Sequence, residues 1–164
     1  MRGVRDAFVF VVVLVLQATL LYRISIGGIR PDLLVAFVVY MGWMRGPIPG
    51  TLTGFFVGLY QDLDAPGPLG LNALSKSIVG FLVAKAGFRV HRSNVGVRFA
   101  FFFIAMMIHD VIYFAVATGG DLGTFLGQMI TVALPSALYT TIVALLLLTM
   151  AEHFSRRLYL ADEI

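Results

Sequence analysis

Cysteine is absent from the chain, and charged residues are scarce. None of the 164 residues is cysteine, which excludes disulfide bonds and thiolate metal sites but identifies no cellular compartment. Only 13% of the residues are charged, 59% are apolar, and the mean hydropathy is +0.92. This composition lies outside the range of soluble domains, and the polar stretches are too short to form one. The sequence therefore predicts an all-α integral membrane protein.

Motifs of the common enzyme classes are also missing. The chain has no H-E-x-x-H, G-x-S-x-G, Walker A or Gly-rich dinucleotide turn, and no Cys/His spacing of a metal site. His91, His109 and His153 fall in a loop, a mid-span and a C-terminal end, so they do not obviously meet. The net charge of +3 comes from basic clusters beside apolar segments, which indicates membrane topology rather than nucleic-acid binding. We expect a non-enzymatic protein without a cofactor or metal.

Six apolar segments follow one another with short connections, which predicts a single compact bundle over residues 1–164. The segments are 7–22, 31–45, 48–62, 69–87, 99–118 and 125–150. The second and third are each only about 22 Å long as helices, so this pair either spans the membrane or forms a re-entrant hairpin. Pro135 is expected to kink the last segment.

The arginines predict the orientation of these segments. With six spans, eight arginines fall on one side of the membrane and only Arg23 and Arg30 on the other. The eight are Arg2, Arg5, Arg45, Arg89, Arg92, Arg98, Arg156 and Arg157. Because positively charged loops stay in the cytoplasm, both termini are expected to be cytoplasmic. A re-entrant hairpin would leave this orientation unchanged.

Glycines recur at every fourth position in the third segment. Gly50, Gly54 and Gly58 lie on one helical face, which Asp62 extends at the outer end. Residues without a side chain allow helices in a membrane to approach closely. The pattern predicts a tightly packed helix pair, with Asp62 as a helix-end carboxylate that binds a lysine or a backbone donor.

Polar residues mark the starts of two neighbouring segments. Pro31 and Asp32 suit a helix start, where a missing N–H costs nothing and a carboxylate meets the positive end of the dipole. After the break LDAPGP, Asn72 and Lys76 share one helical face, one turn apart.

The polar side chains within the apolar segments gather toward the outer side. Counted from the outer ends of their segments, Lys76 and Asp110 lie at nearly the same depth, and charges at such a depth need a partner or access to water. We therefore expect Lys76 and Asp110 to form an ion pair or to line a pocket, with Asp62 and Asn72 along the outer approach. His109 is expected to be a hydrogen-bonded core residue. The other polar residues in the outer halves are Gln17 and Gln128.

The stretch RPDLLVAFVVYMGWMRGPIPGTLTGFFVGLYQDLDAPGPLGLNALSKSIVGFL resembles the MreD family of rod shape-determining proteins. The resemblance rests on Pro31-Asp32, on Gly-x-x-x-Gly-x-x-x-Asp-Leu ending at Leu63, and on Pro68-Leu69-Gly70 followed by a polar residue. It covers about a third of the chain. Asn72 stands where histidine is expected in many relatives.

The resemblance implies an inner-membrane scaffold of the bacterial elongation machinery. Such a subunit acts with MreC and, through it, with MreB, RodA and a class B penicillin-binding transpeptidase in peptidoglycan synthesis. It also implies a fold like the substrate-binding subunits of energy-coupling-factor transporters. The alternative is a transporter subunit that binds a small molecule, and an intramembrane enzyme that uses Lys76, His109 and Asp110 is the least favoured. The sequence leaves open whether two copies associate.

Overall fold

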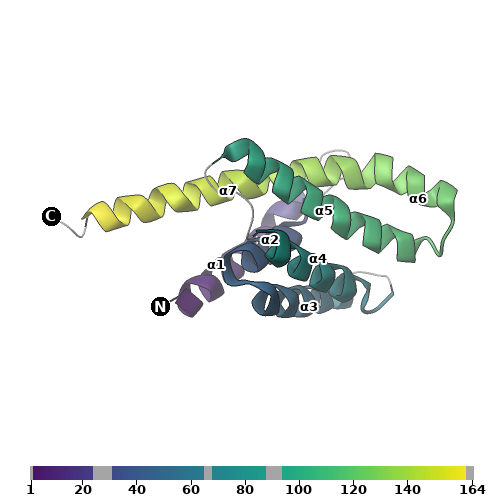
Figure 1. The fold of residues 1–164 in the computed structure, drawn as a ribbon, viewed down its shortest axis with the longest axis horizontal. Helices are drawn as coiled ribbons and strands as arrows, with labels where there is room; N and C mark the ends of the chain where they lie inside the picture. The colour runs from purple at the N-terminus through teal and green to yellow at the C-terminus, as the bar shows by residue number, and fades with distance from the viewer. Residues whose placement is uncertain (1, 24–30, 65–67, 88–93, 162–164) are drawn as a thin grey trace.

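The computed structural model describes residues 2–23, 31–64, 68–87 and 94–161, and its regular structure is helical throughout these ranges (Figure 1). The elements are α1 (Arg2–Arg23), α2 (Leu33–Arg45), α3 (Pro47–Asp64), α4 (Leu71–Gly87), α5 (Val95–Ala117), α6 (Leu122–Gln128), the π-helical turn η1 (Met129–Ala133) and α7 (Leu134–Ala161). Because α6, η1 and α7 are continuous, the described chain forms six uninterrupted helices. The all-helical prediction is confirmed, and each predicted apolar segment overlaps one of these helices. The number of membrane crossings stays a prediction.

Most arginines used to predict the orientation fall outside the described side chains. Arg30, Arg89 and Arg92 lie in ranges that the structure does not describe, as does His91. The side chains of Arg2, Arg5, Arg23, His153, Arg156 and Arg157 also lie outside the described part. Figure 1 shows the N-terminal end of α1 and the C-terminal end of α7 at the same end of the molecule. We call this the terminal end, and the opposite one the far end.

Helix α2 lies at the centre of the bundle. Its buried residues occupy all of its sides: Leu33, Leu34, Val35, Ala36, Phe37, Val38, Val39, Gly42 and Trp43. A helix that is apolar all round is typical of a core position. It ends at Arg45 and is capped by Gly46, whose φ of 99° favours a residue without a Cβ atom. Pro47 begins α3 directly after it, at a position where a missing N–H costs nothing.

The glycine face of α3 lies directly against the backbone of α4. A Cβ atom added at Gly54 would lie closer than 3.0 Å to backbone atoms of Lys76, and one added at Gly58 would meet the backbone of Asn72 in the same way. Real Cβ atoms do not come this close to backbone. Any larger residue at these positions must therefore separate α3 from α4.

A second close contact joins three helices nearer the terminal end. A Cβ atom at Gly50 of α3 would lie 2.6 Å from Cα of Gly42 in α2 and 2.7 Å from the carbonyl oxygen of Gly80 in α4. One at Gly42 would lie 2.6 Å from that same oxygen. The three backbones thus meet without side chains between them, a mode of packing that suits helices in lipid.

Aromatic side chains fill the core beside this contact. The ring of Trp43 lies 4.9 Å from the ring of Phe101 and 6.0 Å from that of Phe102, both in α5. Its Nε1–H donates a 3.3 Å hydrogen bond to the carbonyl oxygen of Gly87, at the end of α4. A buried indole needs such an acceptor, so Trp43 joins α2, α4 and α5 at the terminal end.

Helix α7 follows a π-helical turn that comes just before Pro135. The turn η1 covers Met129–Ala133, and Pro135 has no N–H to donate to the preceding turn. Wider turns of this kind are one way in which a helix accommodates a lost hydrogen bond. The kink predicted at Pro135 stays a prediction, and the π-helical turn contributes to the cavity described below.

Candidate functional site

Asp32 fixes the first turn of α2. Its Oδ1 accepts hydrogen bonds from the backbone N–H groups of Leu34 at 3.0 Å and Val35 at 3.1 Å, as an N-cap residue does. Its own N–H donates to Oγ1 of Thr140 in α7 at 3.0 Å. Gln17 in α1 accepts the N–H of the next residue at 3.0 Å. The start of α2 is therefore tied to both α1 and α7.

Lys76 lies next to Asp32 and is completely buried. Its Nζ is 3.0 Å from Oδ1 of Asn72, 3.2 Å from Oδ2 of Asp32 and 3.0 Å from Nε2 of His109. An ammonium group has three N–H donors, so these three contacts use all of them. Lys76 thereby connects α4 to both α2 and α5.

The structure corrects the ion pair that we expected between Lys76 and Asp110. Oδ1 of Asp110 lies 3.0 Å from Nδ1 of His109, so this carboxylate is linked to Lys76 only through the imidazole ring. The direct partner is Asp32. The expectation assumed that every segment begins at the same depth, whereas α2 has only 13 residues and is about 20 Å long. The contact between Asp32 and Lys76 shows that the first turn of α2 lies level with Lys76.

Asp62 caps α4 from the last turns of α3. Its carboxylate oxygens accept hydrogen bonds from the backbone N–H groups of Gly70, Asn72 and Ala73, each at 3.0 Å. It also accepts from Nδ2 of Asn72 at 3.0 Å. The first N–H groups of a helix have no partner within the helix, so a buried acceptor stabilises them. The partners of Asp62 are thus backbone donors and an amide, with no lysine among them.

The Pro68-Leu69-Gly70 motif forms the turn in which α4 begins. The N–H of Leu71 donates to the carbonyl oxygen of Pro68 at 3.4 Å, and Gly70 has a φ of 94°. Leu69 is 72% exposed. The turn therefore presents the N–H groups of α4 to Asp62, which is a role in folding.

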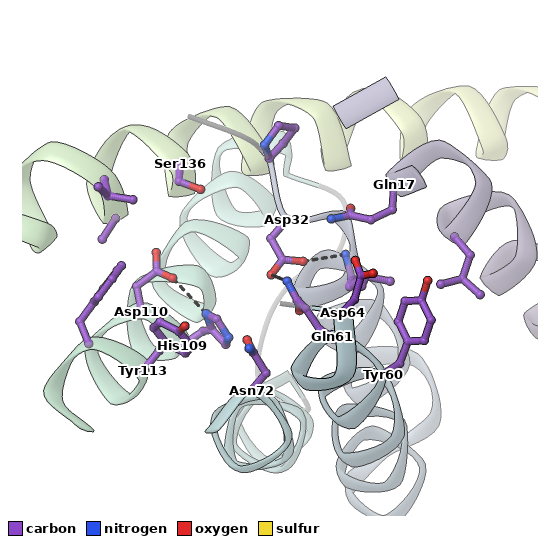
Figure 2. A pocket seen from close by; sticks show the side chains of 16 residues that line it. Gln17, Asp32, Tyr60, Gln61, Asp64, Asn72, His109, Asp110, Tyr113 and Ser136 are labelled. Carbon is purple, nitrogen blue, oxygen red and sulfur yellow. Dashed lines mark hydrogen bonds and ion pairs between the residues drawn. The ribbon is translucent and has the colours of Figure 1, made fainter. Parts of the chain in front are cut away.

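A cavity of about 560 Å³ lies beside this polar network, at the far end of the bundle. Its lining comes from α1 to α5, η1 and α7: Leu14, Gln17, Pro31, Asp32, Leu34, Tyr60, Gln61, Asp64, Asn72, His109, Asp110, Tyr113, Phe114, Val132, Ala133 and Ser136. In Figure 2, His109 and Asp110 face Gln61 and Asp64 across the cavity, with Asp32 between them. The cavity is thus polar on two opposite sides.

The charge on the cavity wall is negative. Asp32, Asp64 and Asp110 line it, whereas the described lining residues include no lysine or arginine. Lys76 lies behind the wall, where it is paired with Asp32. Within the described ranges, no three His, Cys, Asp or Glu side chains lie close enough to hold a metal ion. The arrangement suits an occupant that brings positive charge or hydrogen-bond donors.

Several lining residues were not among the sequence candidates. Gln61 donates to Oδ2 of Asp32 at 3.2 Å, and Asp64 and Tyr60 line the cavity from the same end of α3. These residues lie within two positions of Asp62, and this closeness in sequence could have indicated that they belong to the same site. Tyr113 lies one helical turn after His109, and its ring stacks on the imidazole at 6.1 Å.

Comparison with known protein families identifies the chain. A family model described as rod shape-determining protein MreD matches residues 3–158. The chain belongs to the MreD family. The match extends the resemblance seen in the sequence from about a third of the chain to nearly all of it. Among curated proteins and among solved structures, no match was found.

Membership of the MreD family makes the chain a rod shape-determining membrane protein. In the described part of the chain, two helices are long and apolar enough to cross a membrane, Val95–Ala117 and Leu122–Met150. The MreD family is a shape-determining family and is not known as an enzyme family.

Proposed function

We propose that the chain is a scaffold of the rod complex that binds MreC through the cavity at the far end of the bundle. The observation that carries this proposal is a concave, polar wall with Asp32, Asp64 and Asp110 in a protein that is otherwise strongly apolar. Charged groups within a membrane protein are costly unless they are paired or face water. A cavity with excess negative charge is therefore suited to a partner that supplies the missing positive charge.

The proposed occupant is a segment of MreC that carries lysine or arginine next to its membrane span. A guanidinium or ammonium group at the cavity mouth would have Asp64 and Asp110 as acceptors. Through MreC, the protein would act with MreB, RodA and a class B penicillin-binding transpeptidase, and would thereby support peptidoglycan synthesis. The role is one of binding, without catalysis, cofactor or metal.

The proposed location is the bacterial inner membrane, with both termini in the cytoplasm and the cavity facing outward. The arginine pattern supports this orientation. The N-terminal end of α1 and the C-terminal end of α7 also lie at one end of the molecule (Figure 1), and the cavity is lined by Asp64 and Asn72, next to the turn between α3 and α4 at the other end. A cysteine placed at Leu122, which is 72% exposed, should react with an impermeant maleimide on intact cells. One at Val95, which is 60% exposed, should react only after lysis. The reverse pattern would invert the topology.

Filling the cavity should prevent partner binding without unfolding the protein. Val132 lines the cavity and is 38% exposed, so Val132→Trp adds bulk to open space. Ile130 lies in the same π-helical turn, is 69% exposed and is not part of the lining, so Ile130→Trp is the matched control. We expect Val132→Trp to lose copurification with MreC and rod growth, while Ile130→Trp keeps both. Equal binding by the two variants would place the partner elsewhere.

The alternative function is a small-molecule-binding subunit of a transporter. The cavity volume of about 560 Å³ lies in the range of small-molecule sites, and a fold like that of energy-coupling-factor subunits would agree with it. Native mass spectrometry of the purified protein distinguishes the two functions. A tightly retained small ligand, together with neighbouring ATPase genes, favours transport. Neighbouring mreB and mreC genes favour the scaffold.

A further inference from the structure

The hydrogen bonds around Lys76 have only one consistent direction. Asp62 is an acceptor, so Nδ2 of Asn72 must face it and Oδ1 of Asn72 must face Lys76. Lys76 is a donor only, so Nε2 of His109, 3.0 Å away, must accept and carries no hydrogen. The ring hydrogen is then on Nδ1, where it is donated to Asp110 at 3.0 Å. The structure therefore holds His109 as one neutral tautomer.

We propose that His109 is a protonation switch of the cavity wall. A proton added to Nε2 would point directly at the ammonium group of Lys76, 3.0 Å away, and two donors cannot share that contact. The same proton would strengthen the bond between Nδ1 and the Asp110 carboxylate. The ring thus keeps its hydrogen bond to Asp110 in both protonation states, but it accepts a hydrogen bond from Lys76 only when it is neutral.

Burial of the ring and the charged groups that face it together decide which state of His109 is occupied. From α4, Lys76 opposes protonation; from α5 itself and from α2, Asp110 and Asp32 favour it. Tyr113 stacks on the ring, and the carboxylate of Asp64 on α3 lines the same cavity. The cavity residues of η1 and α7 are Val132, Ala133 and Ser136, which do not titrate. Opposing charges on the two ring nitrogens are the condition for a switch.

A proton can reach this ring from the cavity. His109 and Asp110 both line it, and the side chain of Asp110 is 18% exposed. When Lys76 loses the acceptor on α5, the link between α4 and α5 at this level is lost, while the contacts of Lys76 with Asn72 and Asp32 remain. Protonation should therefore loosen α5 from the rest of the wall and change the shape of the cavity.

The expected direction with pH follows from the proton count. The state in which Lys76 has lost His109 binds one more proton than the state in which Lys76 donates to Nε2, so the donating state is favoured at high pH and is lost as the pH falls. The ratio of the two states changes at most tenfold per pH unit. For MreC binding, the consequence rests on the proposed function: affinity should decrease as the pH falls from 7.5 to 5.5.

The test is thermal unfolding of the purified full-length protein in nanodiscs between pH 8 and pH 5, together with MreC binding. We expect the wild-type unfolding temperature to fall on acidification and His109→Gln to remove that change, because an amide oxygen can still accept from Lys76 but does not titrate. His91→Gln and His153→Gln are the controls and should keep the wild-type profile. Asp110→Asn should move the transition to lower pH. A wild-type profile in His109→Gln would overturn the switch.

Nitrogen NMR of the three histidine rings keeps the test valid even if a variant fails to fold. At pH 7.5 one ring should be neutral with its hydrogen on Nδ1; a hydrogen on Nε2 of His109 would refute the proposal. The switch and the proposed function can fail separately. Loss of the pH profile in His109→Gln without MreC binding at any pH would support the switch and refute the docking site. MreC binding that is equally strong at every pH would refute the regulation alone.

Discussion

The two ends of the contact between α3 and α4 share close glycine packing, but only the far end adds charges and hydrogen bonds to it. Toward the terminal end, Gly50 and Gly80 place two backbones in direct contact, with no side chain between them. At the far end, the Asp62 carboxylate binds the first N–H groups of α4, and Lys76 connects α4 to its neighbours. The packing of the terminal end depends on shape, whereas the far end, where Gly58 also packs on the backbone of Asn72, depends in addition on charge and hydrogen bonds.

This difference separates stability from responsiveness. Helices in lipid gain little from the hydrophobic effect, so they associate through close packing and polar contacts. A glycine contact has nothing to titrate and no partner to exchange, which makes it suitable as a fixed frame. The polar end contains charges that a ligand, a partner or a proton can rearrange. The cavity occurs at the polar end, where such a rearrangement would be useful.

The largest predicted effect comes from removing one charge at the polar end. Lys76→Met leaves Asp32 without its buried ion-pair partner, and breaking a buried pair in this way costs ~3–5 kcal/mol. Oδ1 of Asn72 and Nε2 of His109 also lose their donor. We expect a strong decrease in unfolding temperature in detergent. An unchanged unfolding temperature would show that Lys76 is not paired as in the structure.

A double-variant cycle identifies the partner of Lys76. Adding Asp32→Asn to Lys76→Met should restore part of the lost stability, because asparagine keeps the N-cap of α2 without leaving a charge. Adding Asp110→Asn instead should restore nothing, because Asp110 contacts the imidazole and not Lys76. Rescue by Asp110→Asn would show that Lys76 pairs with Asp110, as predicted from the sequence, and not with Asp32.

The next largest effect is expected at the glycine face. Gly54→Leu must separate α3 from the backbone of Lys76, and overpacking of this kind costs on the order of 3 kcal/mol. Gly127→Leu in α6 is the control, because a Cβ atom there meets nothing within 4 Å. Gly54→Leu keeps His109, so its loss of stability relative to the wild type should be equal at pH 7.5 and pH 5.5. The difference in stability between His109→Gln and the wild type should instead change with pH. Wild-type unfolding of Gly54→Leu would mean that this face is not in contact.

Much of the fold could be predicted from the sequence because local signals agree with packing. The Pro31-Asp32 pair predicts a helix start, and Asp32 is the N-cap of α2. The four-residue glycine period predicts a face for close approach, and Gly54 and Gly58 are buried against α4. Such features are set by residues close in sequence. The bounds of each membrane crossing could not be predicted in this way, because they depend on the thickness of the bilayer, which the sequence does not encode.

The site was predicted less completely, because its contacts depend on relative helix positions. Asn72 and Lys76 could be placed on one face from their spacing, and they are hydrogen-bonded at 3.0 Å. The ion-pair partner of Lys76 could not be predicted, because counting residues from the outer end of each segment cannot show that the start of α2 lies level with Lys76. Asp32 was therefore interpreted as a helix cap alone, although it is also the ion-pair partner.

The smallest predicted effect concerns Asp62, which caps the start of α4 at the far end of its contact with α3. Asp62→Asn removes the negative charge at the start of α4 and replaces one of two accepting oxygens with an NH2 donor, so two N–H groups lose their acceptor and we expect a loss on the order of 2 kcal/mol. The matched control is Asp64→Asn, two residues later on α3, which lines the cavity and is exposed. It should leave stability unchanged.

Hydrogen exchange distinguishes the loss of a cap from a general packing effect. In Asp62→Asn, the amide hydrogens of Gly70, Asn72 and Ala73 should exchange faster, because these N–H groups donate to Asp62. Amides near Gly80, where glycine contacts and apolar packing hold α4, should keep wild-type exchange. Faster exchange along the whole of α4 would show that its two ends are one cooperative unit, and that the division between a fixed end and a responsive end is wrong.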